Sequence, residues 1–294
     1  DNSNMTLSDA RIYDDAKPQS FFKTMAKLPF PDVPSTTVER LGIPIDEGAP
    51  IIRYDESKTR PYRALTMDFS QSGRPVQLYT ANSLSPDPSD WNQEASDIVG
   101  GYSNSGNVET QDYVYDGSTY YVYFTEDDTR TIVFTGSDWT SLTYDSDVVS
   151  DPDCGAYREP DGTTHIFAEN SDDVSGLSSN SIIHYEASGP TGSFSEVELA
   201  VDVNDKPFKV GDPRVEQIKG EYRLWVDCTN GHPYYGTLEA RSPSLYDWEL
   251  ITEDMRLWMG QDFAVAEHPD GYWGVTSGSG DDASAGVALW DVFP

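Results

Sequence analysis

The chain has 294 residues, of which 51 are Asp or Glu and 19 are Lys or Arg, giving a formal net charge of −32. Nucleic acid is therefore not an expected partner, because its phosphates would be repelled. No apolar run approaches the ~20 residues of a membrane span, so no membrane insertion is expected. Aromatic residues make up 12% of the chain, including 18 Tyr and 7 Trp, and this composition favours β-strands.

The N-terminal part of the chain predicts two short elements. The stretch TLSDARIYD (residues 6–14) alternates like a strand, and SFFKTMAKL (residues 20–28) has apolar residues at helical spacing. No signal-peptide pattern is visible at the start. We assign residues 1–45 to a lead-in segment that carries one strand.

Five similar hairpins follow. The clearest is VGDPRVEQIKGEYRLWVD (residues 210–227), where Lys219-Gly220 forms the turn between arms at 214–217 and 222–226. Related stretches begin at Glu47, Glu109, Asp151 and Gln261. Successive hairpins lie about 40 to 60 residues apart, which is the length of one four-stranded propeller blade.

The second half of each unit also repeats. A third strand, a turn rich in Ser, Pro, Gly and Asp, and an aromatic residue that opens an outer strand recur four times, with the aromatic residue at Trp91, Trp139, Phe194 and Trp248. The last unit has no room for an outer strand, and residues 6–14 are predicted to supply it. The predicted fold is an all-β, five-bladed β-propeller in which this N-terminal strand closes the ring within the last blade. Residues 46–294 form the propeller, with blades starting near residues 46, 109, 151, 211 and 261.

In a propeller the first strand of each blade lines the central channel. The predicted first strands begin with acidic residues, one from each blade, which would gather at one mouth: Asp46 or Glu47, Glu109 or Asp112, Asp151 or Asp153, Asp212, and Asp262. Paired carboxylates hydrolyse glycosidic bonds, and the same oxygen ligands hold a cation such as Ca²⁺ in the channel. The structural alternative is that Asp at these places serves turns and caps.

Several other side chains are candidates for the same mouth. Arg214 would grip a sugar hydroxyl or form a structural ion pair, and His232 and Tyr234 lie in a loop that could reach a ligand. The remaining histidines, His165, His184 and His268, are interpreted as structural. Cys154 and Cys228 are interpreted as buried free thiols, with one disulfide as the alternative.

The motifs GDPRV, GEYRLW and RSPSLYDW, together with the five units, resemble the five-bladed propellers of glycoside hydrolase family 43 and its relatives, families 32 and 62. The resemblance implies three acids: an Asp base, an Asp that tunes pKa, and a Glu acid followed by Gly-Pro or a similar pair. Glu47, within EGAP, is similar to the acid, Asp262 to the tuning residue and Asp153 to the base if the blades are circularly permuted. In the unpermuted register the three positions fall on Asp46 or Glu47, Asp153 and Asp212.

The sequence therefore predicts a carbohydrate-recognising propeller, secreted or surface-exposed, that binds a glycan or polysaccharide and hydrolyses glycosidic bonds if it is an enzyme. The alternative is a non-catalytic glycan-binding or structural module on a virion or cell surface, where it would assemble with other virion or surface proteins. The acidic surface favours a salt-adapted source, because molar salt shortens the electrostatic screening length to about 3 Å. An ordinary acidic secreted protein is the alternative reading of the charge.

Overall fold

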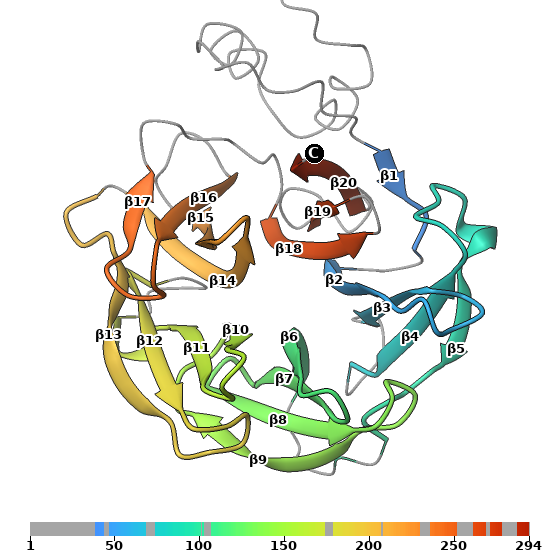
Figure 1. Ribbon diagram of the computed structural model, residues 1–294, viewed down its shortest axis with the longest axis horizontal. Coiled ribbons are helices and arrows are strands. Elements are labelled where there is room, and N and C mark those ends of the chain that lie inside the picture. The colour runs from blue at the N-terminus through green and yellow to red at the C-terminus, as the bar shows by residue number, and fades with distance from the viewer. Residues whose placement is uncertain are drawn as a thin grey trace, which may run out of the picture.

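The computed structural model describes residues 39–43, 47–68, 74–100, 102, 107–173, 179–206, 208–229, 236–251, 261–268, 271–277 and 287–293. Within these residues, twenty β-strands form five four-stranded antiparallel sheets. The sheets are arranged around a common centre, each with its first strand innermost (Figure 1). The prediction of an all-β propeller is confirmed.

Four sheets are built from strands that follow one another in the chain. They are β2 (Glu47–Tyr54), β3 (Tyr62–Met67), β4 (Val76–Ala81) and β5 (Asn92–Ala95); β6 (Val108–Tyr115), β7 (Tyr120–Glu126), β8 (Arg130–Gly136) and β9 (Thr143–Val149); β10 (Cys154–Arg158), β11 (Thr164–Glu169), β12 (Ser181–Ala187) and β13 (Ser195–Asp202); and β14 (Lys209–Ile218), β15 (Glu221–Thr229), β16 (Gly236–Ser242) and β17 (Glu249–Ile251). Two short 3₁₀ turns, Pro88–Asp90 and Ser171–Asp173, complete the described elements.

The fifth sheet combines one strand from residues 39–41 with three strands from residues 261–293. Its order is β1 (Glu39–Leu41), β20 (Val287–Phe293), β19 (Gly271–Ser277) and β18 (Gln261–His268), and β1 pairs antiparallel with β20. The strand predicted at residues 6–14 and the helix predicted at 20–28 lie outside the described residues. The N-terminal strand that pairs with β20 is instead at residues 39–41, closer to the first sheet.

Local sequence explains the hairpins. Lys219 and Gly220 have φ values of +54° and +83° and connect Ile218 to Glu221, as a two-residue turn with both φ values positive requires. The predicted hairpin is therefore confirmed, with arms longer than expected. In the second sheet, Gly117 has a φ of +98°, and the Asp116 carboxylate accepts the backbone N–H groups of Ser118 and Thr119.

The first strands form the inner ring. β6 contacts β2 and β10, β14 contacts β10 and β18, and β18 contacts β2. Register shifts interrupt the pairing near the start of β2, β6, β14 and β18. Such bulges bend a strand and redirect its side chains. Four of the five first strands therefore share an irregular start, and β10 pairs regularly with β11.

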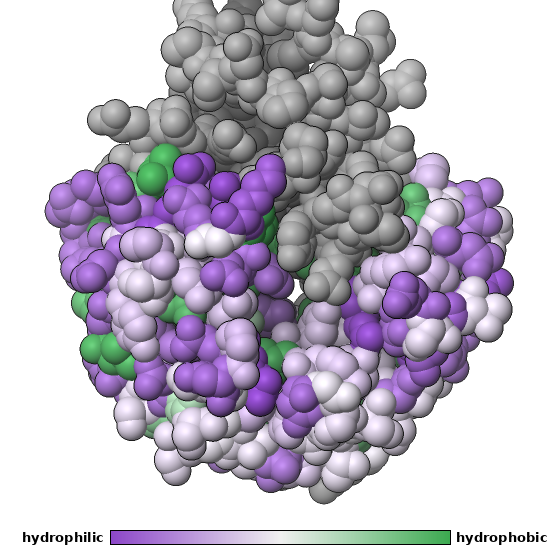
Figure 2. Space-filling view, viewed as in Figure 1, coloured by the Kyte–Doolittle hydropathy of each residue, from purple (hydrophilic) through white to green (hydrophobic). Residues whose placement is uncertain are grey.

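Apolar side chains pack between neighbouring sheets. One core cluster joins the first and second sheets around Leu65, Phe124 and Trp139, and another joins the third and fourth around Phe167 and Leu224. Cys154 and Cys228 are buried and free, which confirms the predicted thiols. The described surface is mostly hydrophilic, with apolar residues scattered over it (Figure 2).

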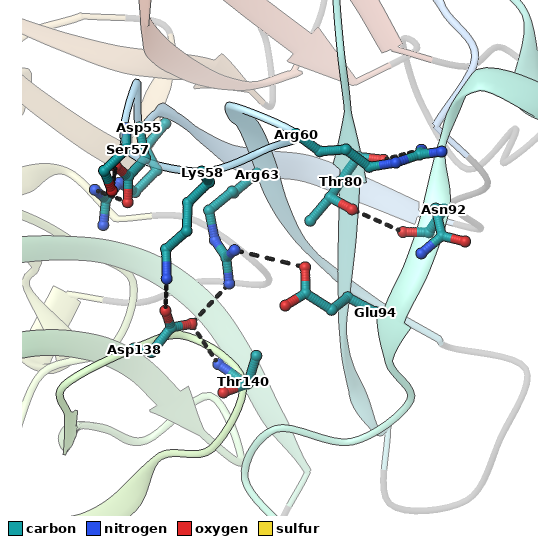
Figure 3. A network of polar contacts seen from close by, with 11 residues as sticks. Asp55, Ser57, Lys58, Arg60, Arg63, Thr80, Asn92, Glu94, Asp138 and Thr140 are labelled. Carbon is teal, nitrogen blue, oxygen red and sulfur yellow. Dashed lines mark hydrogen bonds and ion pairs between the residues drawn. The ribbon is translucent and has the colours of Figure 1, made fainter.

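Polar contacts also join neighbouring sheets. Asp138, in the turn after β8, accepts hydrogen bonds from Lys58 and Arg63 of the first sheet (Figure 3). Arg63 is only 3% exposed and also reaches Glu94. These charges keep the pKa of Asp138 below its usual range, although burial alone would raise it.

The described residues contain no helix long and apolar enough to cross a bilayer.

Candidate functional site

Two predicted site residues occupy equivalent places in neighbouring sheets. Asp153 directly precedes β10, and Asp212 lies in the bulge of β14. Each stands five residues before a residue near the end of the strand, Arg158 or Gln217, which pairs with the second strand of its sheet. Their φ values are +43° and +44°. Left-handed backbone is unusual for a residue other than Gly and concentrates at functional sites. Asp127, Asp128 and Asp247 also have a positive φ, so what sets Asp153 and Asp212 apart is their equivalent place at the start of two neighbouring inner strands.

The Asp153 carboxylate is held by the second sheet. Its Oδ1 accepts a hydrogen bond from Gln111 Nε2 at 2.9 Å and another from Thr125 Oγ1 at 3.0 Å. The Asp153 backbone N–H donates in turn to Thr125 Oγ1 at 2.7 Å. Donors aimed at a carboxylate stabilise its ionised form and fix its orientation.

Glu169, at the end of β11, links the two aspartates. Its backbone N–H donates to the carbonyls of Pro152 and Asp153, and its Oε1 accepts the backbone N–H of Asp212 at 3.2 Å. Glu169 is 2% exposed. Burial raises its pKa well above the usual range, and the negative charges of Asp153 and Asp227 add to this effect. Three acidic residues therefore lie together where the third and fourth sheets meet.

Asp112 connects the second and third sheets. Its Oδ1 accepts the N–H of Tyr113 and its Oδ2 that of Ala156, at 2.8 and 2.9 Å. Burial raises the pKa of Asp112 to about 6, and the positive charge of Arg214 opposes the rise. Both oxygens are committed to backbone groups, so the structure favours an architectural role over the predicted binding of substrate.

Arg214 is buried and committed to the protein. It is 6% exposed, and its guanidinium donates to the carbonyls of Cys154 and Pro213 at 3.0 and 2.8 Å. Its second Nη donates to Gln111 Oε1 at 3.3 Å. Both Nη atoms of Arg214 are engaged by the protein, which favours the structural role over the grip on a sugar.

Two further acidic positions of the predicted ring are also structural. The Asp151 carboxylate accepts the N–H of Ser171 and the hydroxyl of Tyr185. Glu109 pairs with Arg74 across the first and second sheets. Turn and ion-pair roles therefore account for part of the predicted ring.

Two of the other predicted residues lie at the starts of inner strands. Glu47 begins β2 and Asp262 is the second residue of β18, so both occupy starts of inner strands. The side chains of Glu47 and Asp262 lie outside the described part of the chain, as do Asp46, His232 and Tyr234 as a whole. His268 ends β18.

His165 and His184 form a buried pair away from the aspartates. His165 Nδ1 lies 2.9 Å from His184 Nε2 in adjacent strands, and the His184 ring stacks on Phe167. Burial lowers the pKa of His184 to about 3, and His165 adds to the effect. The burial of both rings and the stacking of His184 on Phe167 agree with the structural interpretation.

Sequence reasoning missed Gln111, Thr125 and Glu169. Attention to first strands alone overlooked the ends of second strands, where FTED, FAEN and WVDC place an acidic residue at Glu126, Glu169 and Asp227. That repeat was the available signal. Gln111 had no comparable signal, because its role depends on residues 42 and 103 positions away.

The described site pairs an oriented carboxylate with a buried one. Two hydrogen bonds hold Oδ1 of Asp153, and burial raises the pKa of Glu169 well above its usual range. Within the described residues, no group of three or more His, Cys, Asp or Glu has an arrangement that could hold a metal ion.

No protein-family model matches the sequence, and no curated protein matches it. Solved structures do. The GH43 protein BlXynB from Bacillus licheniformis superposes with a TM-score of 0.59 at 14% identity, over 86% of this chain and 53% of that one. An exo-β-1,3-galactanase from Phanerochaete chrysosporium, solved with galactose, gives 0.58 at 16% identity, over 86% and 60%. A GH43 β-1,3-galactosidase solved with galactodeoxynojirimycin gives 0.62 at 10% identity, over 86% and 93%.

The chain spans little more than half the length of the first two of these structures. At these identities the similarity establishes the fold alone, and one fold hosts unrelated activities. The family 43 propeller architecture is nevertheless shared, as the sequence resemblance implied. The resemblance to families 32 and 62 stays a prediction.

Proposed function

We propose that this protein is a carbohydrate-active propeller that hydrolyses glycosidic bonds. The observation that carries the proposal is the pair of equivalent, left-handed aspartates, Asp153 and Asp212, joined through Glu169. The shared architecture with GH43 glycosidases supports it. The five sheets would be the five blades of one ring, closed by the pairing of β1 with β20.

In this proposal Asp153 is the base that activates water or attacks the sugar, because two hydrogen bonds favour its ionised form. Glu47 is the acid that protonates the leaving oxygen. Asp262 and Asp212 adjust the pKa values of their neighbours. Glu47 and Asp262 are assigned from their positions at strand starts and from the EGAP and QDF motifs.

The test is release of reducing sugar from arabinan, xylan and fructan in molar NaCl. Asp153→Asn and Glu47→Gln should each lower kcat/KM by about 100-fold or more, the scale of a lost acid or base. Asp161→Asn is the matched control, because this aspartate lies in the turn between β10 and β11, at the opposite end of the hairpin. Equal activity of Asp153→Asn and Asp161→Asn would contradict the assignment.

A second candidate is glycan binding without hydrolysis, on a virion or cell surface. It is favoured by the near-complete burial of Glu169 and by the structural commitments of Asp112 and Arg214, which leave fewer groups for chemistry. Glycan-array binding by a protein that releases no sugar from any substrate would select it. The proposed location, secreted or surface-exposed, is common to both candidates.

A further inference from the structure

The contacts around Asp153 continue into a chain that crosses three sheets. Arg214 of β14 donates to Gln111 of β6, and Gln111 donates to Asp153, which precedes β10. Arg214 is also anchored to the Cys154 carbonyl, one residue beyond Asp153. The guanidinium therefore contacts both the backbone beside the candidate base and the side chain that holds its carboxylate.

The two ends of the Gln111 amide differ chemically, so the direction in which the amide points decides which hydrogen bonds it makes. A glutamine amide has one acceptor end and one donor end, and neighbouring groups decide which way it points. Arg214 has only donors, so it faces Oε1 at 3.3 Å. Nε2 is thereby directed to Asp153 Oδ1 at 2.9 Å.

Thr125 completes the arrangement. Its Oγ1 accepts the N–H of Asp153, which leaves the hydroxyl proton to donate to Oδ1. Gln111 and Arg214 are both buried, at 3% and 6% exposure. Loss of a hydrogen-bond partner at a buried polar group is costly, so a reversed amide would be disfavoured.

We infer that Arg214 and Gln111 are positioning residues, in which Arg214 sets the direction of the Gln111 amide and Gln111 orients the Asp153 carboxylate. The inference rests on the proposed function of Asp153. Among the described residues, Glu169 on β11 interacts electrostatically with Asp153, and Arg214, Asp112 and Asp153 all act on the neighbouring Cys154 thiol. Arg214 acts through Gln111, so the two side chains should behave as one unit.

The test measures the titration of the Asp153 carboxyl carbon by NMR in the full chain, in molar NaCl. Gln111→Met removes the donor with little change in volume, and the Asp153 midpoint should rise by about one unit, because a hydrogen bond to the ionised form is lost. Arg214→Met should produce a rise of similar size. The double variant should rise no further than Gln111→Met alone, as expected for residues that act in series.

Gln217→Met is the matched control, since Gln217 accepts a hydrogen bond from Tyr157 and takes no part in the hydrogen bonds that link Arg214, Gln111 and Asp153. Arg214→Lys should retain folding if Arg214→Met does not, and should still shift Asp153, because lysine lacks the planar fork. An unchanged Asp153 midpoint in Gln111→Met, or additive shifts in the double variant, would overturn the inference.

Activity gives a separate readout. If the protein hydrolyses a glycan, the acidic limb of the kcat/KM profile should move to higher pH in Gln111→Met and Arg214→Lys by the same amount as the NMR midpoint. If no substrate is hydrolysed, the proposed function fails, while the NMR titration still decides whether Arg214 and Gln111 orient the Asp153 carboxylate. The two failures are therefore distinguishable.

Discussion

At the scale of single residues, two aspartates close in the sequence have pKa values shifted in opposite directions. Burial raises the pKa of Asp112 to about 6 against the charge of Arg214. Four residues later, slight burial of Asp116 is outweighed by hydrogen bonds from Thr119, Ser118 and Tyr121, which lower its pKa to about 2. The surroundings, and not the residue type, decide the charge of each carboxylate.

This contrast predicts two separate titrations. In a ¹³C NMR titration, the Asp112 carboxyl should have its midpoint near pH 6 and that of Asp116 near pH 2. Because the pKa of Asp112 is raised in the folded state, its contribution to stability is present below 3.8 and is lost as pH rises through 6. Asp116 contributes stability above 3.8 and loses it as pH falls through 2. Coincident midpoints would show that the two surroundings are equivalent in solution.

At the scale of elements, the site depends on close approach of β10 and β14. A Cβ atom at Gly155 would lie 2.6 Å from the Pro213 carbonyl oxygen and 2.9 Å from Arg214 Cα. Only glycine allows the two backbones to come this near. The approach also brings the Cys154 carbonyl within reach of the Arg214 guanidinium.

Gly155→Ala should therefore lower the free energy of unfolding by about 1–3 kcal/mol, the usual cost of overpacking. Gly189→Ala is the matched control, because nothing lies within 4 Å of a Cβ placed there, and its effect should stay within about 0.5 kcal/mol. Urea denaturation in molar salt measures both. Equal stability of the two variants would contradict the close approach of β10 to β14.

At the scale of the whole molecule, the net charge of −32 opposes compaction. Several of the few cations are already used inside the structure, as Arg63 is with Asp138 and Arg214 is with backbone carbonyls. Screening by salt is then the main means of reducing repulsion between the remaining carboxylates. We propose salt adaptation on this basis.

The melting temperature should accordingly rise by several degrees or more between 0.1 and 2 M NaCl, because the screening length falls from about 10 Å to below 3 Å. Thermal unfolding followed by circular dichroism measures the change. Sucrose at matched osmolality should produce a smaller rise, since it does not screen charge. A melting temperature independent of NaCl would favour an ordinary acidic secreted protein.

Much of the fold was predictable because its signals are local. Hairpins are identified by alternating residues and by turns such as Lys219-Gly220, and the outer strands by the aromatic residues before them. Each of these signals spans only a few residues. The repeat then indicates a propeller. The equivalence of Asp153 and Asp212 could also be predicted, since the two hairpins align with Arg158 opposite Gln217, each five residues after its aspartate.

The roles of individual side chains could not be predicted in the same way. Arg214 looked like a binding residue, but its partners, Gln111 and Cys154, lie 103 and 60 positions away in the chain. Asp112 looked like part of the acidic mouth, but Ala156 of the next sheet holds it. Both corrections depend on contacts between sheets, which no local pattern reports.

The all-β architecture, the repeated hairpins and the acidic surface follow from the order of the amino acids, because periodicity, turn chemistry and charge are properties of short segments. The three-dimensional contacts establish which acids meet, which accept backbone hydrogen bonds, and that Glu169 joins Asp153 to Asp212. Burial and hydrogen bonding between distant segments set the charge and orientation of a carboxylate, and residue type alone does not.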